Sequence, residues 1–188
     1  MATVALDELA SLESFESDRL FEIFNGERRE KRPMSALAVM IASVLARRLG
    51  VFAEQHKLGV VVVEMLFRLR PDRPQRRPDV AFVGFERWSE SAAPADDQAA
   101  WDVVPHFAVE VISPTNTAYE VMEKIREYFE AGVQLVWVIY PLQRCVQVFE
   151  SSKNSRILRE GEELDGGTVL PGLRLNVSEL FAAAAKPQ

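Results

Sequence analysis

The 188-residue sequence contains one cysteine, two histidines and fewer basic than acidic residues. Cys145 cannot form an internal disulfide, which excludes a disulfide-stabilised fold and suits a reducing compartment. His56 and His106 form no zinc-binding pattern with this cysteine. The formal net charge of −6 argues against binding of nucleic acid by bulk attraction, so any such contact must use a local basic patch.

The sequence also predicts neither a signal peptide nor a membrane span. Its N-terminus has neither the basic flank nor the apolar core of a signal peptide, and we expect no apolar run elsewhere to be long enough to span a bilayer. We therefore expect a cytoplasmic protein without a membrane segment. The length and the 48% hydrophobic content predict one globular domain over residues 1–188, with residues 1–18 as a leader that is a short helix or flexible.

The first half of the chain predicts a β-hairpin, a helix and two strands. Asn25-Gly26 favours a tight turn between the hairpin strands, because both residues tolerate a positive φ. Ser35 can cap a helix whose apolar residues recur every three or four positions. The predicted elements are hairpin strands 19–24 and 27–31, a helix from 35 to between 50 and 57, strands 60–69 and 79–83, and an exposed loop at 90–97.

The second half predicts a strand, a capped helix and further strands. Thr117 and Glu120 have the spacing of a capping box, and Gly132 suits the left-handed end of the helix. The expected apolar stripe of this helix is Ala118, Met122, Ile125 and Phe129. The other predicted elements are strands 107–112, 134–139, 145–150 and 155–159 and a helix at 178–184. This order predicts an α/β (α+β) fold with a mixed sheet.

Two of the predicted strands carry a carboxylate among apolar residues: Asp79 directly after Pro78, and Glu110 between Val109 and Val111. A buried anion is costly unless a cation neutralises it, and a divalent metal does so effectively. If the two strands pair, the carboxylates converge and can share one ion. Metal-assisted hydrolysis of a phosphodiester also needs a cation for the transition state, and Lys124 on the following helix can reach toward the sheet.

Each of these residues can also be explained without a catalytic or metal-binding role. Asp79 alone can belong to a Pro-Asp turn, and a lysine on a helix is usually solvated. Glu110 fits either an edge strand or a functional site. Glu22 and Glu64 can be exposed residues of their strands, and the sequence leaves both alternatives open.

Several motifs together resemble one known family. They are Pro78-Asp79, the run from Val109 to Pro114, Lys124 with Tyr128, the segments 131–133 and 136–139 with Pro141, the hairpin 21–27, and the turn at 170–173. In this order they resemble the Uma-two family of restriction endonucleases, within the PD-(D/E)XK nuclease superfamily. The resemblance runs from about residue 19 to 181. It implies a restriction-endonuclease-like core with flanking helices and an N-terminal hairpin.

The resemblance also implies site roles. Asp79 and Glu110 would be the metal ligands, Glu22 an additional acidic residue and Lys124 the catalytic lysine, with Mg²⁺ or Mn²⁺ as the ion. The chain departs from the superfamily pattern at Ile112, where a lysine usually stands. It also lacks the histidine that relatives often place near residues 35–38.

Two basic clusters flank the acidic residues and can contact phosphates. They include Arg29 in the first cluster and Arg68, Arg70 and Arg77 in the second. We expect a metal-dependent endonuclease that acts on DNA. We also expect a homodimer, because the apolar strands 60–69 and 134–149 offer more surface than one helix pair covers, and enzymes that cut both DNA strands often pair their active sites. Two alternatives remain: an inactive nuclease-fold protein that binds nucleic acid or a protein partner, and a hydrolase of small phosphoesters.

Overall fold

The computed structural model describes residues 19–24, 27–69, 74–88, 99–182 and 184. The leader 1–18, the turn at Asn25-Gly26 and the loop at 90–97 lie outside these ranges. The elements are β1 (Phe21–Phe24), β2 (Glu27–Glu30), α2 (Ala36–Gln55), β3 (Gly59–Val63), β4 (Phe67–Arg68), β5 (Gln75–Arg76), β6 (Val80–Gly84), α3 (Phe85–Trp88), β7 (Phe107–Val111), α4 (Ala118–Ala131), β8 (Leu135–Tyr140), β9 (Cys145–Ser151), β10 (Asn154–Arg159), β11 (Glu163–Asp165), β12 (Arg174–Asn176) and α5 (Val177–Ala182).

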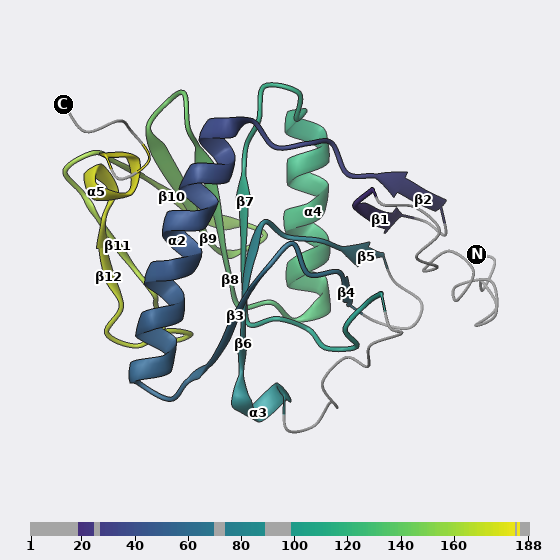
Figure 1. The fold of residues 1–188 in the computed structure, drawn as a ribbon, viewed down its shortest axis with the longest axis horizontal. Helices are drawn as coiled ribbons and strands as arrows, with labels where there is room; N and C mark the ends of the chain where they lie inside the picture. Colours follow the sequence, from purple (N-terminus) through teal and green to yellow (C-terminus); the bar gives the residue numbers. More distant parts are fainter. Residues whose placement is uncertain (1–18, 25–26, 70–73, 89–98, 183, 185–188) are drawn as a thin grey trace.

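A central six-stranded sheet organises the molecule, in the order β10-β9-β8-β7-β6-β3. Strands β7 and β8 run parallel, with α4 as the connection between them, and the other neighbouring pairs are antiparallel. Helix α2 covers one face of this sheet and α4 the other (Figure 1). The predicted α+β fold with a mixed sheet is confirmed.

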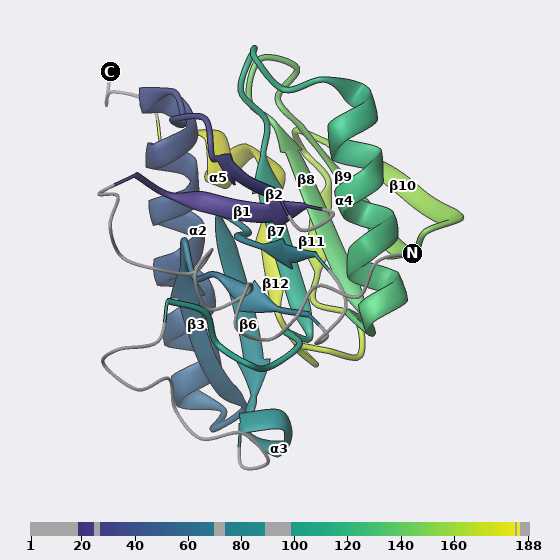
Figure 2. The same ribbon diagram turned by 90° about the vertical axis from the view of Figure 1, so that its right-hand side faces the viewer.

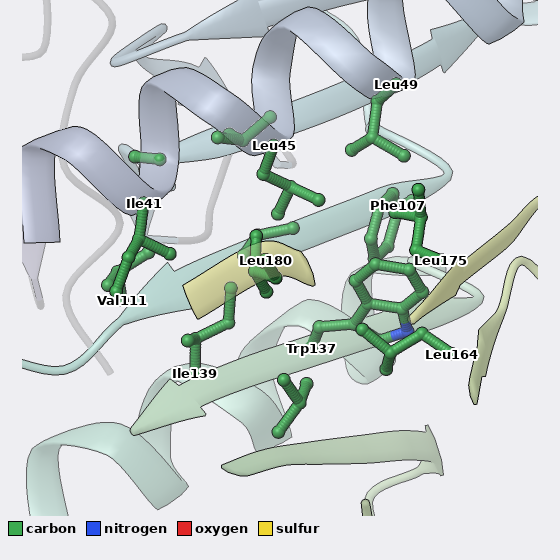
Figure 3. Packing of buried hydrophobic residues seen from close by; sticks show 14 of the residues in the cluster. Ile41, Leu45, Leu49, Phe107, Val111, Trp137, Ile139, Leu164, Leu175 and Leu180 are labelled. Atoms are coloured by element: carbon green, nitrogen blue, oxygen red, sulfur yellow. The ribbon is translucent and has the colours of Figure 1, made fainter. Parts of the chain in front are cut away.

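The larger apolar core lies between the sheet and α2. Ile41, Leu45 and Leu49 of α2 are fully buried, and they face Phe107 and Trp137 of the sheet (Figure 3). Burial of each such aliphatic side chain stabilises the fold by about 1.5–3 kcal/mol. Ser35 caps α2 as predicted, because its hydroxyl accepts a hydrogen bond from the amide of Ala38 at 3.2 Å.

Helix α2 also meets the length and composition of a membrane span. Its 20 residues include a window of mean hydropathy 1.8, so the sequence-based statement that no apolar run is long enough was wrong. Such a helix is weak support for a membrane segment, because core helices of globular proteins have the same composition. Here the face with Ile41, Leu45 and Leu49 packs on the sheet.

Helix α4 begins and ends as the sequence predicts. The Thr117 hydroxyl accepts from the amide of Glu120 at 3.2 Å, and the Glu120 carboxylate accepts from the amide of Thr117 at 3.0 Å. This reciprocal capping box satisfies two amides that have no partner within the helix. Gly132 ends the helix with a φ of 107°, a left-handed conformation that favours glycine.

The predicted apolar stripe of α4 was half right. Of its four residues Ile125 is fully buried and Phe129 packs half-buried against the core, whereas Ala118 and Met122 are exposed. The face toward the sheet instead carries Val121, Ile125 and Tyr128. The helix is therefore rotated relative to the prediction, and the rotation brings Lys124 close to the sheet.

A second, four-stranded sheet in the order β2-β1-β5-β4 lies next to the central sheet (Figure 2). The hairpin β1–β2 is confirmed, with Glu22 paired to Arg29. The predicted strand 60–69 is split, because Glu64 has a φ of 50° and ends β3. The continuation, β4, pairs with β5 instead. The sequence did not predict the short pair β11–β12.

We expect Gly59→Ala to destabilise the fold. A Cβ at Gly59 would lie 2.1 Å from the carbonyl oxygen of Val83 on β6, so the backbone of this strand pair would have to move. The cost should be about 1–3 kcal/mol of unfolding free energy, or a melting temperature lower by roughly 2–10 °C. Gly50→Ala is the control, because its Cβ meets nothing within 4 Å and alanine favours the helix. A melting temperature unchanged in Gly59→Ala would contradict this account of the β3–β6 contact.

Candidate active site

The two predicted strand carboxylates lie side by side on the α4 face of the central sheet. Strands β6 and β7 are antiparallel with Val80 opposite Val109, so Asp79, one residue before β6, stands opposite Glu110. The amide of Asp79 donates to the carbonyl of Val109 at 3.0 Å. The Asp79 Oδ2 atom accepts from the amide of Val111 at 2.6 Å. The backbone of β7 therefore fixes the Asp79 carboxylate next to Glu110.

Lys124 reaches this pair from α4. Its Nζ lies 3.2 Å from Glu110 Oε2 and 2.9 Å from Glu22 Oε1, and its side chain is 17% exposed. Glu22 comes from β1 of the hairpin. The four predicted catalytic residues Asp79, Glu110, Lys124 and Glu22 are therefore brought together, and their chemical roles stay predictions.

Tyr128 contacts the other oxygen of the Glu110 carboxylate. Its hydroxyl donates to Glu110 Oε1 at 2.6 Å, and the side chain is fully buried. The sequence analysis did not assign Tyr128 to the site. The signal that could have found it is its position one helical turn after Lys124, since both then face the same strand.

A buried arginine network supports Glu22. Arg76 Nε lies 2.6 Å from Glu127 Oε2, and Arg76 Nη1 lies 3.4 Å from Glu22 Oε2. The amide of Arg77 also donates to Glu22 Oε1 at 3.0 Å. These contacts fix the hairpin carboxylate over the end of the central sheet.

The sequence analysis also did not assign Lys31 to the acidic site. Its Nζ lies 2.7 Å from Asp79 Oδ1, 2.7 Å from Glu64 Oε2 and 2.9 Å from the carbonyl oxygen of Arg77. The left-handed φ of 50° at Glu64, which costs roughly 1–2 kcal/mol in a non-glycine residue, directs this carboxylate to Lys31. No local pattern signals these contacts, because Lys31 is more than thirty positions away from Glu64, Arg77 and Asp79.

Burial and charge shift the pKa values of this cluster. Burial would raise the pKa of Glu22, but Lys124, Arg76 and the amide of Arg77 outweigh it and hold the value below 4.5. Burial raises the pKa of Glu110 despite Lys124. Burial would lower the pKa of Lys124, but Glu110 and Glu22 raise it, so this lysine is charged at neutral pH.

The pKa of Lys31 is raised as well. Burial would lower it, and the negative charges of Asp79, Glu110 and Glu64 outweigh burial. Burial raises the pKa of Tyr128, to which the nearby Glu110 adds. At neutral pH the cluster therefore contains two charged ammonium groups and a neutral phenol that donates a hydrogen bond to a carboxylate.

A cavity of about 200 Å³ opens over these residues. Largely buried carboxylates and lysines form its floor, and the exposed side chains of Arg29 and Arg32 stand at its rim. The lining residues that carry charge are Glu22, Arg29, Glu30, Lys31, Arg32, Arg76, Asp79, Glu110, Glu120, Glu123 and Lys124.

The predicted phosphate-contacting arginines differ in their placement. Arg29 lines the cavity with a side chain 58% exposed, whereas Arg68 lies 3.6 Å from Asp102. The Arg77 guanidinium donates to the carbonyl oxygens of Phe21 and Glu64, so it holds the two sheets together. Arg70 lies outside the described residues.

The donor set at the floor of the cavity fits a hard divalent cation. Mg²⁺ binds oxygen ligands and commonly uses one or two carboxylates together with waters and substrate phosphates. Asp79 and Glu110 can supply two such carboxylates. Within the described ranges, no three Asp, Glu, His or Cys side chains are grouped to hold a metal as they stand. The carboxylate oxygens instead contact Lys31, Lys124, Tyr128 and the amide of Val111.

Comparison with known families agrees with this arrangement of residues. The family model Uma2, described as "Putative restriction endonuclease", matches residues 6–178. The chain belongs to the Uma2 family. No curated protein matches the chain.

A solved structure supports the same fold. It is described as a putative nuclease belonging to DUF820 from Anabaena variabilis, and it is similar to this chain with a TM-score of 0.77 and 18% sequence identity. The match covers 93% of this chain and 97% of the other. The predicted restriction-endonuclease-like core is therefore confirmed at the level of the fold.

We expect Glu22→Gln to remove a pH-dependent part of the stability. The folded pKa of Glu22 is below its ordinary value of 4.5, so the unfolded state binds more protons as the pH falls below 4.5 and stability declines through this window. At pH 7 the variant should lose on the order of 3 kcal/mol, because Lys124 and Arg76 lose a buried partner.

Urea unfolding at several pH values between 3 and 7 measures this difference. The gap between parent and Glu22→Gln should narrow as the pH falls below 4.5. Glu27→Gln, on an exposed side chain of β2, serves as the control and should follow the parent. A gap of equal size at pH 3 and pH 7 would refute the assigned shift.

Proposed function

We propose that this protein is a divalent-metal-dependent endonuclease that hydrolyses phosphodiester bonds in DNA. The observation that carries the proposal is the convergence of Asp79 and Glu110 with Lys124 at the floor of one cavity. Membership of the Uma2 family and the nuclease-like fold support a nuclease activity. The metal and the DNA substrate are parts of the proposal.

The residues of the site would have different roles in the proposed hydrolysis. Asp79 and Glu110 would hold the ion, which when bound polarises a phosphoryl oxygen and acidifies the attacking water. Lys124, charged and close to Glu110, would stabilise the negative charge that develops on the phosphoryl group. Tyr128 fixes the Glu110 carboxylate in place through its hydrogen bond.

Substrate binding would rely on the cavity rim. Arg29 and Arg32 line the cavity, and both side chains are more than half exposed. In a chain of net charge −6 such local cations are suited to the phosphate backbone. Contacts of this kind position the nucleic acid without reading its sequence.

One observation favours the alternative of an inactive nuclease-fold protein. The Asp79 and Glu110 carboxylates each contact an ammonium group, so the ion would have to enter a site that is already neutralised. The following experiment decides between the two.

Purified protein should nick supercoiled plasmid DNA with Mg²⁺ or Mn²⁺ and not with EDTA. Asp79→Asn should abolish nicking, because it removes a ligand charge. Lys124→Met should reduce nicking by on the order of a hundredfold or more. Lys153→Met, in the exposed turn between β9 and β10, is the control and should keep the parent rate. Nicking that survives Lys124→Met in folded protein would exclude the lysine mechanism, and no nicking by the parent with any metal would favour the inactive alternative.

Pairing of two copies stays a prediction. Of the two apolar regions on which the homodimer prediction was based, 134–149 offers little free surface, since β8 and most of β9 are buried within the protein. Strand β3 remains, because it is the edge of the central sheet and its Val63 is 55% exposed. Light scattering at micromolar concentration should give twice the 21.2 kDa chain mass, and a monomer mass would refute the dimer.

A further inference from the structure

Lys31 occupies a built oxygen site. Three oxygens surround its Nζ at 2.7–2.9 Å: those of Asp79, Glu64 and the carbonyl of Arg77. The side chain is 10% exposed, and Asp79 Oδ2 is fixed by the amide of Val111. The ammonium therefore stands at the carboxylate that the proposed function assigns to the metal.

The elements around Lys31 come from three distant parts of the chain. Lys31 follows β2, Glu64 ends β3 with its left-handed backbone, and Asp79 precedes β6. The amide of Glu64 donates to the carbonyl of Asp79 at 3.3 Å, so these two carboxylates are anchored to each other through the backbone. The oxygens around the ammonium thus belong to the folded scaffold.

Lys31 and Lys124 have separate partners. Lys124 contacts Glu110 and Glu22, whereas Lys31 contacts Asp79 and Glu64. Removing Lys124 would leave Lys31 on Asp79. A divalent ion bound to Asp79 must therefore compete with Lys31, since two cations in contact with one carboxylate repel each other strongly away from bulk water.

We propose that Lys31 is an internal cation that competes with the divalent metal for Asp79. This inference rests on the proposed function and predicts two states of Lys31. Without metal, the ammonium neutralises Asp79 and Glu64 and stabilises the fold. When the metal binds, the Lys31 ammonium leaves Asp79. The protein therefore binds the metal more weakly than the same carboxylates would without Lys31.

The test compares Mn²⁺ binding by calorimetry in the parent and in Lys31→Met, which has an uncharged side chain of similar length. We expect Lys31→Met to bind Mn²⁺ at least about tenfold more tightly, because binding no longer displaces an ammonium group. Arg29→Met is the matched control, since it removes a positive charge from the same cavity that does not contact Asp79. It should change the affinity by less than about threefold, because exposed charges are screened.

A second readout is the melting temperature without and with Mn²⁺. Lys31→Met should melt lower than the parent in EDTA, and Mn²⁺ should raise its melting temperature more than that of the parent, following its tighter binding. If Lys31→Met does not fold without metal, Lys31→Gln, which keeps a hydrogen-bond donor, takes its place in both measurements.

Three results would overturn the inference. Equal Mn²⁺ affinity in the parent and Lys31→Met would exclude competition and leave the proposed metal site intact. An equal gain in Lys31→Met and Arg29→Met would show a general effect of charge in the cavity. Absence of Mn²⁺ binding in the parent and in Lys31→Met would overturn both the inference and the metal-dependent function.

Discussion

The neutralisation of buried carboxylates on one face of the central sheet is the interaction on which the site depends. Asp79, Glu110 and Glu22 are each less than 10% exposed, and anions at such depth are unstable without nearby cations. Lys31 and Lys124 supply these cations through contacts of 2.7–3.2 Å. Because the lysines come from two different segments, the same ion pairs fix the hairpin and α4 relative to the sheet.

The need to neutralise these carboxylates explains several features that would otherwise destabilise the fold. Glu64 accepts a left-handed backbone, and its carboxylate thereby reaches Lys31. Tyr128 places a hydroxyl in an apolar interface, where Glu110 accepts its hydrogen bond at 2.6 Å. Arg76 is buried between Glu22 and Glu127. Glu110, Tyr128 and Arg76 thus each have a charged or hydrogen-bonding partner, which favours a rigid cluster.

The sequence predicted what depends on short-range pattern. The carboxylates of Asp79 and Glu110 stood out against their apolar strands, and Thr117 with Gly132 marked both ends of α4. The convergence of Asp79 and Glu110 followed from the pairing of their strands. Lys124 was predicted to reach the sheet because it borders the buried face of its helix.

What the sequence did not predict depends on long-range contacts. Lys31 resembles any lysine of a basic run, and only the packing of its segment against β6 brings it to Asp79. The break at Glu64 was missed because Val60 to Leu69 is rich in β-branched and apolar residues and resembles one strand. The two halves of this run pair with different sheets. The rotation of α4 was missed because Tyr128 combines an apolar ring with a polar contact.

Diffraction from crystals soaked in Mn²⁺ and measured at an energy sensitive to manganese tests the central claim most directly. The account predicts one manganese peak in contact with the carboxylates of both Asp79 and Glu110, with the Lys31 ammonium moved away from Asp79. A crystal saturated with Mn²⁺ that shows no peak at these carboxylates, and in which Lys31 still contacts Asp79, would contradict it.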